Sequence, residues 1–317
     1  MVNEKDLDCW IISSGLIGCE NQCIGLADQL KLKYKIKRVK PSRFLSLTAP
    51  YGTPKSKNEI IAPYPKFIIG AGRKIIPYIK NIKKNSNDKC FTIYLQNPKI
   101  NTNHFDLVWA PNHDNLKGDN VISTLLSPGR VSNEFLQFEK EKWKDKFSIL
   151  PKPFITILIG GKSKAFDFSE KECSRILLSI DKVINLGWTP LISMSRRTPE
   201  RLILDIKNLV KNKPHYLYDN IGENPYYAFL AVSEIALVTP DSVNMISETL
   251  TANLPTYIFD LKCKSKRIKN FLFTLKNEKY IREFNETIEI YDLKKTNATT
   301  MIANHIKSIK TPLKTIN

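Results

Sequence analysis

The sequence has few of the features that mark several large classes of protein. Its 317 residues include only six cysteines and no Cys-x-x-Cys pair, a pattern that argues against a disulfide framework and against a zinc site of paired thiolates. No apolar run reaches the roughly 18–20 residues of a membrane-spanning helix. The acidic N-terminus precedes an apolar run that is too short for a signal peptide. We therefore expect a soluble protein of a reducing cytoplasm.

Acidic residues are scarce in one part of the chain. Residues 29–100 hold 17 Lys/Arg side chains against only Glu59 and Asp88, a net charge of +15, whereas the whole chain carries +18. This basic stretch predicts an anionic partner, either an anionic lipid or membrane surface or a phosphorylated substrate. Lysines that merely face solvent are the alternative. No nucleic-acid recognition motif accompanies the charge, so nucleic acid is not predicted as a partner. A cytoplasmic protein of this kind could lie peripherally on the inner face of a membrane.

Short continuous apolar runs alternate with stretches of helical periodicity along the chain. Such runs are typical of parallel strands that helices cover on both faces. They predict strands at 8–14, 34–39, 66–69, 91–95, 105–110, 154–159, 191–194, 215–218, 235–238 and 255–259. The periodic stretches predict helices at 19–30, 75–84, 133–147, 169–186, 199–210, 225–232, 242–252 and 296–310.

The predicted fold class is α/β, with two Rossmann-like, doubly wound domains facing a cleft. Pro151 and Pro153, together with the helix before them, place the boundary near residue 150. The domains are then 1–150, which carries the basic stretch, and 151–317, with the helix at 296–310 able to pack back on the first domain. Ligands of doubly wound sheets bind beyond the carboxyl ends of the strands. The residues that follow strands are therefore the candidates for function.

A glycine pair follows the first strand of the second domain. Gly160 and Gly161 could let backbone N–H groups approach a phosphate, and Lys162 could add positive charge. The surrounding TILIGGKS lacks the first glycine of a P-loop, so nucleoside triphosphatase chemistry is not predicted. An ordinary turn between strand and helix is the alternative interpretation.

Two adjacent arginines leave the next strand, in the segment that contains Ser195, Arg196 and Arg197. A helix N-terminus is already positive, so two arginines there disfavour the helix unless an anion neutralises them. One of the two could bind a phosphate. Alternatively, one faces solvent and the other pairs with a surface acid.

The segment 239–248 is the densest in polar groups. Asp241 or Ser242 could cap the helix that includes Met245, leaving free N–H groups beyond the strand. Glu248 lies about two turns further along, where a carboxylate could accept hydrogen bonds from a ribose diol. A simple cap and a solvated glutamate are the alternatives.

In the first domain, polar residues also gather where strands end. Gly18, Glu20, Asn21 and Gln22 follow the first strand, and Gly72 and Arg73 follow the third; these form a candidate acceptor side. His113 beside Asp114 could serve as a general base near neutral pH, although such a loop pair is often structural. The sequence offers no metal-ligand cluster, so no metal site is predicted.

Taken in order, these segments resemble a family named for a plant mitochondrial-fission factor of the elongated-mitochondria phenotype, which has many bacterial members. The matching stretches cover nearly the whole chain: GLIGCENQCIGLADQL (15–30), GAGRK (70–74), QNPKI (96–100), FDLVWAPNHD (105–114), NVI (120–122), LIGGKSKAF (158–166), SRRTP (195–199), ENPYYAFLA (223–231) and TPDSVNMISETLTANLPTYIF (239–259). The family is similar to GT-B glycosyltransferases. The resemblance implies that Glu248 corresponds to the glutamate that holds the nucleotide ribose in that fold.

One position departs from the family pattern, because Cys19 stands where the family commonly has His, directly before Glu20. Glu20 or the pair His113–Asp114 would then supply the base, or the chain would bind without turnover. The first hypothesis is a metal-independent glycosyltransferase that uses a nucleotide sugar of unspecified base as substrate, with no tightly bound cofactor and an envelope or lipid-linked acceptor. A non-catalytic adaptor and a nucleotide sensor are the alternatives. The oligomeric state is not predicted.

Overall fold

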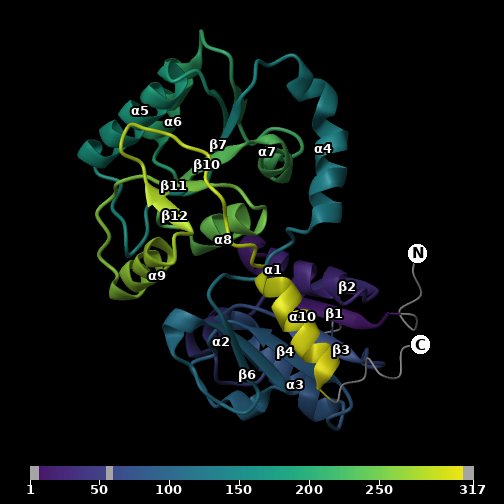
Figure 1. The fold of residues 1–317 in the computed structure, drawn as a ribbon. Coiled ribbons are helices and arrows are strands. Elements are labelled where there is room, and N and C mark those ends of the chain that lie inside the picture. Colours follow the sequence, from purple (N-terminus) through teal and green to yellow (C-terminus); the bar gives the residue numbers. More distant parts are fainter. Residues whose placement is uncertain (1–6, 55–59, 310–317) are drawn as a thin grey trace. The chain divides into compact units, whose positions relative to one another are not determined.

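The computed structural model describes residues 7–54 and 60–309 and divides into two compact units. Unit 1 comprises residues 1–130 and 297–317, and unit 2 comprises residues 131–296. Each unit contains a six-stranded, wholly parallel sheet (Figure 1). Within the described ranges, no helix is long and apolar enough to cross a membrane. The predicted α/β class with two doubly wound sheets is confirmed.

The sheet of unit 1 has the strand order β2-β1-β3-β4-β5-β6. Its elements are β1 (Cys9–Ser13), α1 (Ile17–Gln29), β2 (Tyr34–Arg38), α2 (Arg43–Thr48), β3 (Phe67–Gly70), the 3-10 turn η2 (Arg73–Ile75), α3 (Ile76–Asn85), β4 (Phe91–Leu95), η3 (Thr102–His104), β5 (Leu107–Pro111), η4 (Asn112–Asp114), β6 (Val121–Thr124) and α10 (Ala298–Ser308). Every residue of β1 and β3 is buried, as expected for strands covered on both faces.

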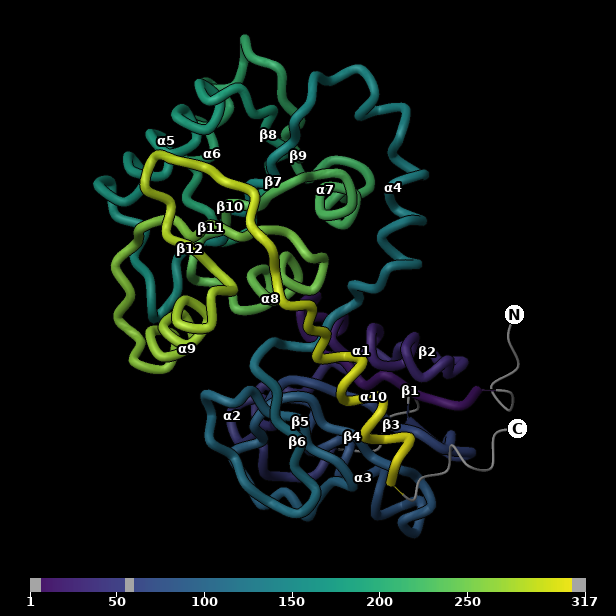
Figure 2. The backbone as a smooth tube through the Cα atoms, viewed as in Figure 1, coloured from purple at the N-terminus to yellow at the C-terminus, as the bar shows by residue number. Residues whose placement is uncertain are grey.

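The last helix, α10, belongs to unit 1 although unit 2 precedes it in the chain. Ile302 and Ile306 are fully buried in one apolar cluster with Leu26 of α1, and the yellow end of the tube in Figure 2 lies along α1. The N–H of Gly129 donates to the Thr299 hydroxyl at 2.9 Å. The helix predicted at 296–310 is thus placed on unit 1, and its final expected residue lies outside the described part of the chain.

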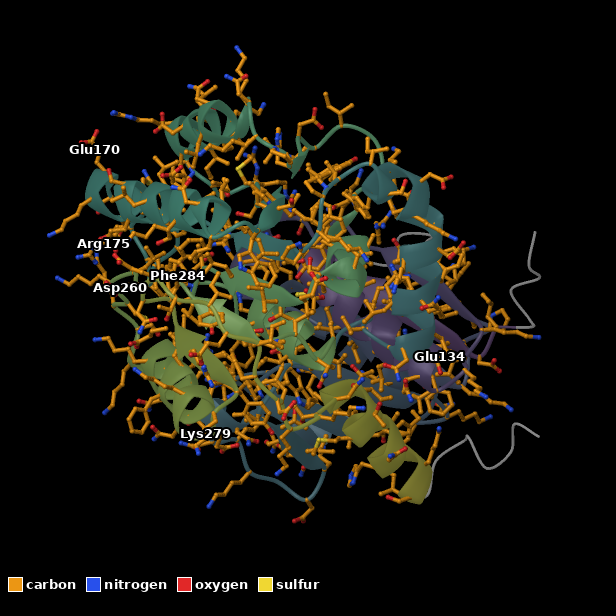
Figure 3. The ribbon with its side chains drawn as sticks, turned by 45° about the horizontal axis from the view of Figure 1, so that its top comes forward. Glu134, Glu170, Arg175, Asp260, Lys279 and Phe284 are labelled. Atoms are coloured by element: carbon orange, nitrogen blue, oxygen red, sulfur yellow. The ribbon has the colours of Figure 1, made fainter. Side chains whose placement is uncertain are left out.

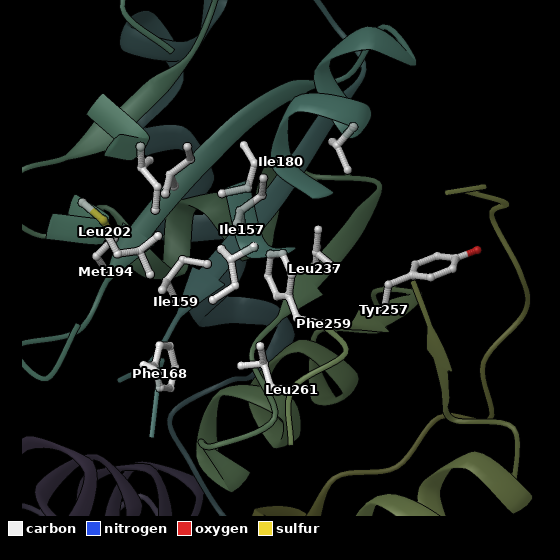
Figure 4. Close-up of a cluster of buried hydrophobic side chains, with 14 of the residues drawn as sticks. Ile157, Ile159, Phe168, Ile180, Met194, Leu202, Leu237, Tyr257, Phe259 and Leu261 are labelled. Carbon is white, nitrogen blue, oxygen red and sulfur yellow. The ribbon is translucent and has the colours of Figure 1, made fainter. Parts of the chain in front are cut away.

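The sheet of unit 2 has the order β12-β11-β10-β7-β8-β9. Its elements are α4 (Asn133–Ser148), β7 (Phe154–Ile159), α5 (Glu170–Asn185), β8 (Thr189–Met194), α6 (Glu200–Val210), β9 (Tyr216–Tyr218), α7 (Tyr226–Val232), β10 (Ile235–Val238), α8 (Val243–Thr251), β11 (Thr256–Ile258), α9 (Lys266–Asn277) and β12 (Ile281–Glu283). Figure 4 shows part of the core, where Ile157 and Ile159 of β7 lie with Leu237 of β10 in one buried apolar cluster.

Surface ion pairs tie helices of unit 2 to neighbouring segments. The Arg175 guanidinium of α5 donates to the Asp260 carboxylate at 3.0 Å, and the two labelled side chains lie next to each other in Figure 3. Both are exposed, so water screens the attraction and the pair contributes little to stability. At the start of α5, Ser169 and Glu172 form a complete capping box.

The structure divides the chain earlier than residue 150. The division falls between Arg130 and Val131, which assigns the helix α4 to unit 2. The physical reason is hydrophobic packing, because Trp143 and Phe147 of α4 are buried in a cluster with Phe229 of α7. The two prolines after α4 therefore lie inside unit 2.

Apart from the 3-10 turns, four of the described elements were not among the predicted ones: α2, β6, α9 and β12. Three of them are six residues long or shorter, too short for periodicity to distinguish them from loops. The helix α9 is long enough and buries Ile268, Phe271 and Leu275 at helical spacing, so its pattern was present in the sequence and was overlooked.

Candidate functional site

The order in which the chain adds strands to the parallel sheet of unit 2 reverses between β7 and β10: β8 and β9 follow toward one edge, and β11 and β12 follow toward the other. A crevice forms at such a switch point in doubly wound sheets. The loops that leave β7, β8 and β10 at their carboxyl ends are 160–169, 195–199 and 239–242. These three loops include most of the residues predicted for the second domain.

The glycine pair allows the three loops to pack tightly. A Cβ atom on Gly160 would lie 2.0 Å from Oδ1 of Asp241, and one on Gly161 would lie 2.0 Å from the Arg197 carbonyl oxygen. The N–H of Gly161 donates to Oδ2 of Asp241 at 3.0 Å. This amide, which the sequence suggested for a phosphate, is therefore bonded to a carboxylate of the chain itself.

Asp241 is the centre of this network. Its side chain has no exposed surface and accepts hydrogen bonds from the Thr239 hydroxyl at 2.7 Å and from Nη2 of Arg197 at 2.9 Å. Arg197 also donates from Nη1 to the carbonyl oxygens of Gly161 at 3.0 Å and Lys162 at 3.1 Å. Both terminal nitrogens of the Arg197 guanidinium thus have partners, and the side chain joins all three loops.

Arg196 and Lys162 differ from Arg197 in their surroundings. Both are exposed, and among the described residues neither side chain has a hydrogen bond or an ion pair. Their loops are joined directly, because the N–H of Lys162 donates to the carbonyl oxygen of Arg197 at 3.2 Å. Two cations without an acidic partner therefore lie on neighbouring loops beyond β7 and β8.

The helix α8 begins directly after β10. The hydroxyl of Ser242 accepts from the N–H of Met245 at 3.3 Å, so Ser242 is the cap and Asp241 serves the loop network instead. Of the two caps that the sequence left open, the structure selects the serine. Ser195 likewise has a local role, since its hydroxyl accepts from the N–H of Arg197 at 3.1 Å.

Glu248 lies further along α8, and two tyrosines of α7 bind it. The Tyr226 hydroxyl donates to Oε2 at 2.6 Å and the Tyr227 hydroxyl donates to Oε1 at 3.2 Å. Burial raises the pKa of Glu248 to about 7, although both phenol hydrogen bonds lower it. A half-buried carboxylate whose pKa lies near neutrality is typical of a functional site.

The two tyrosines were missed by the sequence reasoning. Their rings lie perpendicular at 5.1 Å, and Tyr227 also packs edge-on against Phe135 of α4 at 5.0 Å. The stretch ENPYYAFLA that contains them matched the family pattern, and this was the available signal. Their link to Glu248 depends on how α7 and α8 pack, which no local pattern encodes.

In unit 1, Glu20 is tightly bonded within its own unit. Its carboxylate accepts from the Ser13 hydroxyl at 2.6 Å and from Nε and Nη2 of Arg38 at 2.9 and 3.0 Å. The hydrogen bond from Arg38 is the main cause of a lowered pKa for Glu20. A carboxylate with a lowered pKa is a weaker proton acceptor, so this geometry does not favour Glu20 as a general base.

Other predicted residues of unit 1 gather around Cys19 of α1. Nε2 of Gln96 donates to Sγ of Cys19 at 3.4 Å and to Oε1 of Gln22 at 3.5 Å. Gly72 has a φ of 97°, and a Cβ there would lie 3.7 Å from the Cys19 sulfur. Burial raises the pKa of the Cys19 thiol. Gly18 and Asn21 lie on the same helix, the former exposed.

Arg73 serves α2. Its guanidinium donates to the carbonyl oxygens of Ser46 at 2.9 Å, Leu47 at 3.5 Å and Ala49. A cation at the C-terminal carbonyls of a helix stabilises it. The arginine predicted for an acceptor is therefore engaged in fixing a short helix.

His113 and Asp114 follow β5, and Nε2 of His113 lies 4.0 Å from Oδ1 of Asp114. Glu20 follows β1, and the strands β3 and β4 separate β1 from β5. At ~4.8 Å between strands, the ends of β1 and β5 are about 14 Å apart. The two candidate bases thus belong to different places on the sheet. Within the described residues, no three His, Cys, Asp or Glu side chains are grouped so that they could hold a metal ion.

Comparison with known proteins places the chain in a family. The sequence model of the family described as "Mitochondrial fission ELM1" matches residues 17–309. The chain belongs to this ELM1 family. It is 25% identical to the mitochondrial fission protein ELM1 of Arabidopsis thaliana over 69% of its own length and 57% of that protein's. It is 27% identical to an uncharacterized protein of Rickettsia prowazekii (strain Madrid E), over 95% and 98% of the two chains.

Solved structures show the fold that this ELM1 family member shares. The UDP-GlcNAc 2-epimerase of Neisseria meningitidis, solved with UDP-GlcNAc bound, matches 95% of this chain and 99% of its own with a TM-score of 0.51 at 14% identity. The enzyme of the same name from Methanocaldococcus jannaschii covers 95% and 93%, with a TM-score of 0.51 at 12% identity. At this identity the likeness concerns the fold, which is GT-B-like.

Proposed function

We propose that this chain binds a nucleotide sugar on unit 2 and, as a GT-B-like glycosyltransferase, transfers the sugar to an envelope or lipid-linked acceptor. The observation that carries the proposal is the Glu248 carboxylate of α8, the helix that follows β10, held by two phenol hydroxyls of α7. A ribose diol needs an acceptor of this kind. The fold is shared with the UDP-GlcNAc 2-epimerase of Neisseria meningitidis, which was solved with UDP-GlcNAc bound, and this supports the choice of ligand class.

The diphosphate would meet the cations that have no partner. Arg196 and Lys162 are exposed on joined loops, and a guanidinium can bind a phosphate with two parallel hydrogen bonds. Glu248 lies six residues along the chain from Ser242, about 9 Å along a helix axis, a span that a nucleoside diphosphate can bridge. In this proposal cationic side chains stabilise the leaving group without a divalent ion.

The test is titration calorimetry of the full chain with UDP, ADP, GDP, CDP and their sugars. We compare the wild type with Glu248→Ala and with Glu278→Ala, an exposed glutamate at the end of α9 that serves as the matched control. Loss of a charge-assisted hydrogen bond should weaken nucleotide binding at least tenfold in Glu248→Ala and leave Glu278→Ala unchanged. Removing a ribose hydroxyl from the ligand should weaken binding to the wild type but not to Glu248→Ala. Equal affinities across all three proteins would contradict the site.

A second candidate, binding without transfer, is favoured by the bonding of Glu20. Its bidentate ion pair with Arg38 and its lowered pKa leave unit 1 without a strong base at that position. This candidate covers both a nucleotide sensor and an adaptor. Release of nucleoside diphosphate from the bound nucleotide sugar, measured with and without EDTA, separates the candidates. Nucleotide binding with no such release favours the sensor, and no nucleotide binding favours the adaptor.

A further inference from the structure

Unit 1 exposes several large apolar side chains on and after α2. Phe44 and Leu47 lie three residues apart on α2, on one face, and are 75% and 79% exposed; Tyr51 and Ile61 are 63% and 57% exposed. Leu45, on the opposite face, is buried. Lys40, Phe44 and Ile61 line a single hollow of the unit. We call Phe44, Leu47, Tyr51 and Ile61, with the basic residues Lys40 and Arg43, the α2 surface.

The helix is held firmly despite its short length. The Ser42 hydroxyl caps its N-terminus by accepting from the N–H of Leu45 at 3.2 Å. At the other end, Arg73 donates to the carbonyl oxygens of Ser46, Leu47 and Ala49. Both ends of α2 are thus fixed by side chains, so that Phe44 and Leu47 are kept pointing away from the core of unit 1. A fixed helix that exposes two large apolar groups is expected where another surface covers them.

Charge identifies the covering surface. Residues 31–54 and 60–87 contain 13 lysines and arginines and no aspartate or glutamate, although Arg38 and Lys83 pair with Glu20 and Asp106 of the same unit. Lys40 and Arg43 are exposed and, among the residues that the structure describes, have no ion pair. Aromatic and aliphatic side chains surrounded by cations fit the boundary between the anionic head groups and the acyl chains of a bilayer.

We infer that the α2 surface binds an anionic membrane, with Phe44 and Leu47 inserted among the acyl chains and Lys40 and Arg43 at the head groups. This inference goes beyond the proposed nucleotide site and does not depend on it, because every residue of the α2 surface lies in unit 1. The nucleotide titration above uses residues of unit 2, so either proposal can fail alone.

The experiment is flotation of the full chain with two kinds of vesicle, one of phosphatidylcholine alone and one that also contains phosphatidylglycerol as the anionic lipid. Each is measured at low and at high salt. The test variant is the double Phe44→Ser/Leu47→Ser. The matched control is Phe138→Ser/Leu204→Ser, a phenylalanine and a leucine of unit 2 that are 62% and 60% exposed. A second test variant, Lys40→Gln/Arg43→Gln, removes charge alone. Because all these side chains are exposed, the melting temperatures of the variants should match that of the wild type.

The inference requires binding to anionic vesicles that weakens with salt. It requires at least a tenfold loss of partitioning in Phe44→Ser/Leu47→Ser, a smaller loss in the charge variant, and none in the control. No binding to anionic vesicles, or equal binding by the apolar variant and the control, would overturn it. A concentration-dependent dimer that Phe44→Ser/Leu47→Ser abolishes would also overturn it, because a second copy of the chain would then be the covering surface.

Discussion

The two neighbouring arginines should respond to substitution in opposite ways, because one joins the loops of unit 2 and the other faces solvent. Arg197→Ala removes three hydrogen bonds and leaves the fully buried Asp241 carboxylate with only the Gly161 N–H and the Thr239 hydroxyl. Breaking a buried ion pair from one side costs about 3–5 kcal/mol. The Arg197 side chain is 46% exposed, which places the expected loss at the lower end, about 3 kcal/mol.

For a unit of this size, 1 kcal/mol corresponds to roughly 2–4 °C in melting temperature. Unit 2 of Arg197→Ala should therefore melt about 6–12 °C below the wild type in a calorimetric scan, and Arg196→Ala should melt with the wild type. Nucleotide titration of the folded proteins should rank the two variants the other way, because Arg196→Ala should bind nucleotide roughly tenfold more weakly than the wild type. The double variant Arg197→Ala/Asp241→Asn should regain part of the lost stability, since no buried charge is left unpaired. An Arg197→Ala protein that melts with the wild type, or an Arg196→Ala protein that melts as low as Arg197→Ala, would refute this reasoning.

Two further substitutions test the packing of each unit. Burial raises the pKa of Glu248 from 4.5 to about 7, so the folded state holds this proton more tightly than the unfolded chain. The stabilising effect of the proton is complete below pH 4.5 and is lost as pH rises through 7, so Glu248→Gln should gain stability over the wild type between pH 5 and 8, by as much as about 3 kcal/mol. Melting temperatures of the two proteins that run parallel across this pH range would contradict the burial of Glu248. A Cβ on Gly25 would lie 1.9 Å from the Gly129 carbonyl oxygen, so Gly25→Ala should lower the stability of unit 1 by about 1–3 kcal/mol despite the better helix propensity of alanine, and a melting temperature at or above that of the wild type would show that the backbone there yields freely.

Much of the fold could be predicted because burial leaves a local trace. Continuous apolar runs located ten strands of the two parallel sheets, and the Ser169–Glu172 pattern located a helix start. Short elements, such as α2 and β6, left no comparable trace. The boundary near residue 150 rested on two prolines, whereas burial of Trp143 against α7 decides which unit owns α4.

The sequence alone also located most candidate groups, because residues that follow parallel strands must meet at one edge of a sheet. It determined that Gly160, Asp241 and the two arginines share that edge. It could not decide which arginine serves the fold, since Arg196 and Arg197 are neighbours with the same chemistry.

Only the tertiary structure decided the partners. Asp241 approaches Arg197 across 44 residues and Glu20 meets Arg38 across 18, while the tyrosines reach Glu248 from another helix. Periodicity reports which face of an element is buried, but a hydrogen bond depends on strand order and helix packing that bring distant residues within about 3 Å. The same geometry explains three departures from expectation. The Gly161 N–H, expected at a phosphate, donates to Asp241, and Glu20, expected as a base, is paired with Arg38. Arg73, expected at an acceptor, donates to carbonyl oxygens of α2.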